Sequence, residues 1–274
     1  MLAVVSILVK AGLYVGVLGT VGFATHRVAM RLESRKLIAA SVALLVLCVA
    51  LRLLVLNAEL AGGLARMFDF SQFAWIWSPN KAQFYGYLAG SGVVLVGVMA
   101  GMRSMVILGA VVVLVGVGLG GHTRGLDNPG LSPWIVSIHV GIAAFWVTAP
   151  VTLWPSSDVN HDEIVYRMER FSAIAIRTVP LMFAGGLWLG VQLTGSIYAF
   201  IASGYGLLLM TKLLLACGAL AIGVANKFWI AKILQNKQMG GRVFLQRALT
   251  VDSVLFAGIV IAIASATSVT GPGA

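Results

Sequence analysis

Two histidines in otherwise apolar surroundings are the residues best able to do chemistry. His122 follows Gly120-Gly121 at the end of one long apolar run, and His139 lies six residues after Pro133 in the next run. If the runs are helical, a rise of 1.5 Å per residue places His139 only about 9 Å from the end of its helix, within reach of His122. Neutral imidazole is a favoured ligand for copper and other transition metals, so the pair indicates a metal site. Packing or hydrogen bonding of the two rings is the alternative interpretation.

Spacing does not identify a third ligand. Polar or soft side chains expected near the same membrane face are Asp127, Met67 and Asp69. Trp146 lies seven residues after His139, two helical turns further along the same face, and either lines the site or packs. Lys212 falls about two turns inside a later apolar run, where an ammonium group needs a partner or a water-filled cavity.

The remaining ionisable residues have simpler interpretations. His26 and His161 stand beside charged residues between apolar runs, and we expect both to be solvated loop side chains. Asp252 is the only carboxylate in an expected span, and we expect it to pair with Arg177 or Arg247. The chain has two cysteines, both in apolar runs, which excludes a disulfide framework or a CxxC metal site.

The elements that must position these residues are long apolar segments. The chain has 274 residues, of which 59% are hydrophobic and 10% charged, which excludes an ordinary soluble domain. Segments long enough to cross a bilayer are 2–24, 37–57, 81–100, 104–121, 133–154, 173–199, 205–226 and 249–269. We therefore predict an all-α polytopic membrane protein with eight transmembrane helices in one bundle. It would form a single domain, 1–274, with four helices in 2–121 and a second half in 122–274.

The net charge of +10 is mostly an orientation signal. Twelve Lys and Arg residues fall in the odd-numbered loops and three in the even-numbered loops. By the positive-inside rule the odd-numbered loops are cytoplasmic, and both termini face the periplasm of a Gram-negative host. The basic charge is thus explained by the lipid bilayer, and we expect no nucleic-acid partner. The first apolar run lacks a cleavage site and is read as a span.

Short motifs follow one another in a set order through the second half. They are Gly121-His122-Thr123, Ile138-His139 with Trp146, Arg170-Phe171-Ser172, Tyr205-Gly206 with Lys212, Asn226-Lys227, and Arg247 with Asp252. In order and spacing, residues 120–274 resemble the CopD copper-resistance family of inner-membrane proteins. The first half agrees with that family in helix count and hydropathy but carries no matching motif. Many relatives have Glu at the position of Asp252 and a small residue pair at Val147-Thr148.

The resemblance implies a role in copper resistance, as a protein that moves copper across the cytoplasmic (cell inner) membrane. By position, His122 and His139 would contact copper, while Trp146 and Lys212 are family positions without an assigned role. The family often works with a small periplasmic copper carrier, CopC. No CopC-like β-domain is recognisable in this chain, so we expect any such carrier to be a separate protein.

Two other functions agree with the same residues. Paired histidines near one membrane face can ligate b-type haem in a membrane redox protein. A scaffold or assembly subunit without a ligand of its own is the third possibility. We expect no enzymatic activity and no primary active transport, because the sequence has no P-loop, no phosphorylatable-aspartate motif and no large cytoplasmic domain.

Overall fold

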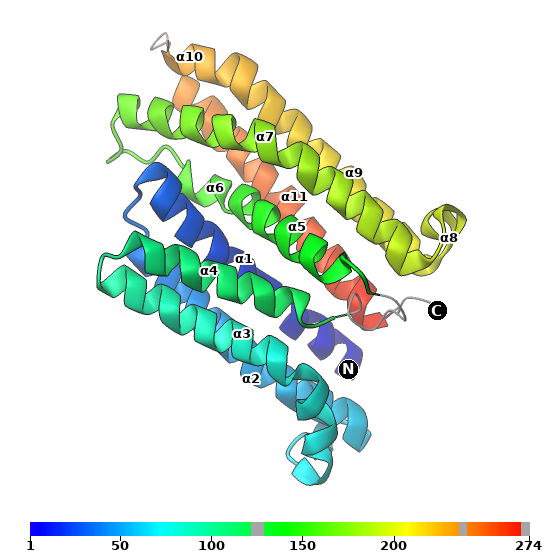
Figure 1. The fold of residues 1–274 in the computed structure, drawn as a ribbon. Helices are drawn as coiled ribbons and strands as arrows, with labels where there is room; N and C mark the ends of the chain where they lie inside the picture. Colours follow the sequence, from blue (N-terminus) through cyan, green and yellow to red (C-terminus); the bar gives the residue numbers. More distant parts are fainter. Residues whose placement is uncertain (122–128, 236–239, 270–274) are drawn as a thin grey trace.

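The structure, a computed structural model, describes residues 1–121, 129–235 and 240–269, and within these ranges it contains helices and short connections but no strand (Figure 1). The elements in chain order are α1 (Leu2–Met30), α2 (Arg35–Ala61), η1 (Leu64–Arg66), η2 (Phe70–Gln72), α3 (Phe73–Met99), α4 (Arg103–Gly118), α5 (Ser132–Val147), α6 (Ala149–Thr152), α7 (His161–Thr194), α8 (Ile197–Ala202), α9 (Gly204–Ala225), the π-helical turn η3 (Asn226–Ile230), α10 (Ala231–Gln235) and α11 (Gly241–Val269). The expected all-α class is confirmed.

The long helices match the length of a bilayer crossing. In the described part of the chain, seven helical segments are long and apolar enough to span a membrane. Helix α4 is also apolar but has 16 residues, or about 24 Å, and is shorter than a typical hydrocarbon core, whereas α5 reaches 21 residues together with α6. The protein is therefore a multi-span α-helical membrane protein.

The largest difference from the expected spans is at the start of α7. This helix begins at His161, twelve residues before the apolar run at 173, because its first turn is well capped. The side chain of Asn160 accepts a hydrogen bond from the backbone N–H of Glu163 at 2.7 Å. Asp162 and Glu163 add negative charge where the helix dipole favours it.

Helix α1 lies in the middle of the bundle and contacts α2, α4, α5 and α11 (Figure 1). It approaches α2 closely because Gly16 faces the backbone of Leu45, where an added Cβ would lie 2.7 Å from the Leu45 Cα. Small residues permit such contacts between membrane helices, where dispersion and not hydrophobic burial drives association. Helix α1 thus connects α2–α4 to α5–α11.

Helices α3 and α4 form a second close pair through facing glycines. A Cβ on Gly90 would lie 2.6 Å from the backbone nitrogen of Val113, and one on Gly109 would lie 2.5 Å from that of Val94. Both distances are shorter than van der Waals contact, so any side chain at these positions would force the helices apart.

The expectation that His26 is a solvated loop residue is wrong. His26 lies inside α1 and is fully buried. Its Nε2–H donates to the carbonyl of Phe145 at 2.8 Å, and its Nδ1 accepts from the hydroxyl of Thr152 at 2.7 Å. The ring also meets Phe145 edge-on at 4.4 Å. His26 is helical because α1 continues to Met30. Its two hydrogen bonds join α1 to α5 and α6.

The expectations for the carboxylates in the spans also need correction. Asp252 is buried on the same face of α11 as Leu249 and Phe256, and within the described ranges it forms no ion pair with Arg177 or Arg247. Its Oδ1 has no hydrogen-bond partner there. It is not the only carboxylate in a span, because α2 continues to Ala61 and includes Glu59.

The glycine contact between α3 and α4 gives the first prediction. We expect Gly90→Ala to lower the free energy of unfolding by about 1–3 kcal/mol, because the new methyl group overpacks the interface. Gly92→Ala is the matched control, since a Cβ there meets no atom within 4 Å. The measurement is thermal unfolding of the purified protein in detergent. Equal unfolding midpoints for the two variants would show that the helices are not closely packed at Gly90.

The unpartnered oxygen of Asp252 gives the second prediction. Asp252→Leu should raise the free energy of unfolding by about 1–3 kcal/mol, because it removes the desolvation penalty of an unsatisfied buried oxygen. Asp252→Asn should raise the free energy of unfolding much less, since a polar group remains buried at this position. Thermal unfolding in detergent compares the two variants with the wild type. A Leu variant less stable than the Asn variant would show that Asp252 has a stabilising partner.

Candidate metal site

His139 is the eighth residue of α5 and contacts α7 and α9. It lies about 10 Å along α5 from the end of the bundle where α1 begins and α11 ends, which we call the terminal end (Figure 1). Its half-buried imidazole projects from α5. Nδ1 lies 2.8 Å from the backbone carbonyl oxygen of Met182 in α7, and Nε2 lies 3.3 Å from Nζ of Lys212 in α9. The structure thus brings together two of the residues selected from the sequence, His139 and Lys212.

The two contacts determine the protonation pattern of the ring. A carbonyl oxygen can only accept, so Nδ1 of His139 must carry the hydrogen that bonds to Met182. In the neutral imidazole, Nε2 then holds a lone pair, and it accepts a hydrogen bond from the ammonium of Lys212. Metal-binding histidines commonly donate from one nitrogen to a carbonyl in this way, which orients the other nitrogen toward the ion.

Gly186 makes room for this ring. A Cβ at Gly186 would lie 2.8 Å from Cε1 and 3.3 Å from Nδ1 of His139. The sequence interpretation missed both Gly186 and the carbonyl of Met182. The pair Gly185-Gly186 inside an apolar helix could have signalled a close approach, whereas the partner of a backbone carbonyl leaves no signal in the sequence.

Trp146 lies beyond His139 along α5 and away from the terminal end. Its side chain is buried and meets Phe256 edge-on at 5.5 Å and Phe183 at 6.2 Å. Together with Val179, Met182, Ala219 and Phe256 it forms a buried cluster. Trp146 therefore supports the packing of α5, α7 and α11, further from the terminal end than the imidazole.

Met67 and Asp69 lie elsewhere, in the connection between α2 and α3. The buried side-chain amide of Asn57 donates to the carbonyls of Met67 and Asp69, at 2.9 and 2.8 Å. Hydrogen bonds from Ser71 lower the pKa of the exposed Asp69 carboxyl. Figure 1 shows this connection on the far side of α1 from α7 and α9. The structure therefore separates these two candidates from His139.

The other two candidates, His122 and Asp127, lie outside the described residues. Among the residues that are described, no group of three or more His, Cys, Asp or Glu side chains could hold a metal ion. Within the described ranges, the polar side chain in contact with Nε2 of His139 is that of Lys212, at 3.3 Å.

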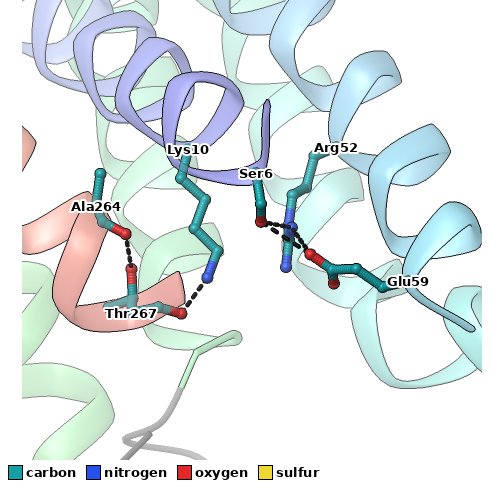
Figure 2. Close-up of polar contacts among 6 residues, drawn as sticks. All are labelled: Ser6, Lys10, Arg52, Glu59, Ala264 and Thr267. Atoms are coloured by element: carbon teal, nitrogen blue, oxygen red, sulfur yellow. Dashed lines mark hydrogen bonds and ion pairs between the residues drawn. The ribbon is translucent and has the colours of Figure 1, made fainter. Parts of the chain in front are cut away.

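A second polar network at the terminal end connects α2, α1 and α11 (Figure 2). Nζ of Lys10 donates to the backbone carbonyl of Thr267. Arg52 donates to the hydroxyl oxygen of Ser6 at 3.1 Å and to Oε1 of Glu59 at 3.5 Å, and Ser6 in turn donates to the same Glu59 oxygen at 2.8 Å. Each charged group in this network has a protein partner, so we assign it a structural role.

Comparison with known proteins adds one match. The family model described as Copper resistance protein D, CopD, matches residues 166–266. No curated protein and no solved structure gives a significant match.

The matched segment begins in α7 and ends in α11, and it contains Met182, Gly186, Lys212 and Asp252. His139 and Trp146 precede it, so their assignment to the family pattern remains a prediction. Over residues 166–266, the chain matches the CopD copper-resistance family.

Proposed function

We propose that this protein moves copper across the bacterial cytoplasmic membrane and contributes to copper resistance or homeostasis. The observation that carries the proposal is the match of residues 166–266 to the Copper resistance protein D family, in a chain with multiple apolar spans. Copper is the cargo in this proposal and not a resident cofactor. The transport is not coupled to a catalytic reaction of this chain.

The entry site in this proposal is His139, assisted by His122. In support, Nδ1 of His139 is anchored on the Met182 carbonyl, which leaves the Nε2 lone pair for a metal ion. A single imidazole is an incomplete copper site, so the proposal assigns His122 as a further ligand.

We also propose an orientation of the protein in the membrane. With α4 as an eighth span, both termini lie in the periplasm, because the basic residues gather in the connections at the opposite end. His139 then lies near the periplasmic face and receives copper from that side. The donor is a separate periplasmic carrier of the CopC type.

The copper site is tested by replacing each proposed ligand. We expect His139→Ala and His122→Ala to weaken copper binding by the purified protein at least about tenfold, since each removes an imidazole ligand. Both should change cellular copper content and copper tolerance relative to the wild type.

His161→Ala is the matched control for these variants. His161 is the first residue of α7, at the end of that helix away from the proposed copper site. Its Nε2 lies 2.5 Å from the Leu234 carbonyl oxygen. This variant should retain wild-type copper binding. Unchanged copper handling in both His122→Ala and His139→Ala would refute the assigned site.

The orientation has its own test. Alkaline phosphatase, which is active only in the periplasm, should be active when fused after Ala274. It should be inactive when inserted after Glu33 in the connection between α1 and α2, where positive charge gathers. Activity measured in whole cells expressing each fusion distinguishes the two locations, and the reverse pattern would invert the proposed orientation.

A further inference from the structure

We propose that Lys212 is a tethered cation that occupies the His139 lone pair in the metal-free protein, and that copper binds there by displacing it. The inference rests on the proposed copper function and adds a competitor built into the same site. It starts from one contact, the 3.3 Å approach of Lys212 Nζ to His139 Nε2.

The geometry makes Nε2 the point of competition. The Met182 carbonyl oxygen, 2.8 Å from Nδ1, holds the single N–H hydrogen of the neutral ring on that nitrogen. Nε2 can then bind either a hydrogen-bond donor or a metal ion, and not both at once. The Lys212 ammonium, which has donors and no lone pair, currently takes that position.

Because both are cations, copper has to replace the Lys212 ammonium at Nε2 and cannot bind beside it. Two unit cations about 4 Å apart repel strongly in a protein interior, where the effective dielectric constant is far below that of water. Replacing the ammonium by Cu(I) keeps one positive charge at Nε2, so the bilayer interior gains no second uncompensated cation there. The arrangement therefore favours a monovalent ion over a divalent one.

The position of Lys212 permits the exchange. It is the ninth residue of α9, so it lies about 12 Å from the start of that helix at the terminal end. The flexible four-carbon stem can turn its ammonium toward that end and the membrane interface. No Asp or Glu of the described ranges forms an ion pair with Lys212 that would hold it in place.

Lys10 provides a natural comparison in the same bundle. It is also a lysine within a span, but its ammonium donates to the Thr267 carbonyl in the last turns of α11 (Figure 2). Carbonyls at a helix C-terminus and the helix dipole both favour a cation. Lys10 therefore stabilises a helix end, whereas Lys212 faces a ligand atom.

The test measures Cu(I) affinity of the full-length protein in detergent, by competition with a chromophoric Cu(I) chelator under reducing conditions. Lys212→Leu, which keeps an apolar side chain but removes the charge and adds no metal-binding atom, should bind Cu(I) at least about tenfold more tightly than the wild type, because no ammonium has to be displaced. Lys212→Gln should also bind more tightly, while Lys212→Arg should not. Lys10→Leu, the matched control, should bind like the wild type.

The outcomes separate this inference from the proposed function. If His139→Ala binds Cu(I) like the wild type, the proposed site itself is wrong. If His139→Ala loses affinity while Lys212→Leu and Lys212→Gln bind equally or more weakly than the wild type, the site remains and the competition is refuted. Tighter binding that persists in a Lys212→Leu, His139→Ala double variant would also refute it. Thermal unfolding of each variant verifies that it is folded.

Discussion

The cost of an unsatisfied polar group in a hydrocarbon environment governs this structure more than any other constraint. The backbone of a helix forms its own hydrogen bonds, so the polar groups that still need partners are the few polar side chains inside the spans. His26 bonds to a carbonyl and a hydroxyl, and Lys10 bonds to a carbonyl at the end of a helix. Arg52 is matched by Glu59 and Ser6. The contacts of His26 and Lys10 join helices that are distant in sequence, so each also defines how the bundle is assembled.

A comparison of His26 with His139 shows how the same residue type serves different ends. His26 donates from Nε2, and its remaining lone pair is filled by the Thr152 hydroxyl in a fully buried setting. His139 donates from Nδ1, and its remaining lone pair faces a flexible lysine. A neutral hydroxyl fixed on a helix is a permanent partner, whereas a lysine stem can move. This difference makes His139, and not His26, the candidate for binding an ion.

Helix α1 gives the candidate site its setting. It packs on α2 through Gly16 and on α5 near His26, and it reaches α11 through Lys10. The segment matched to the copper-resistance family, 166–266, supplies α9 and most of α7 and α11. The imidazole comes from α5, outside that segment. The candidate site therefore forms where the matched segment packs against the rest of the chain.

The sequence alone determined the all-α membrane class, because apolar runs of about 20 residues have few alternatives to a spanning helix. It also selected His139 and Lys212 individually, since imidazole and ammonium groups are rare in such runs. It could not find the partners, because the Met182 carbonyl and the space at Gly186 exist only once α5 and α7 pack together. It misplaced His26, because helix α1 extends past its apolar run. It also missed Glu59 as a span residue for the same reason in α2. Hydropathy reports which residues prefer hydrocarbon, whereas hydrogen-bond partners depend on how helices far apart in sequence are oriented. Only the tertiary structure decides that.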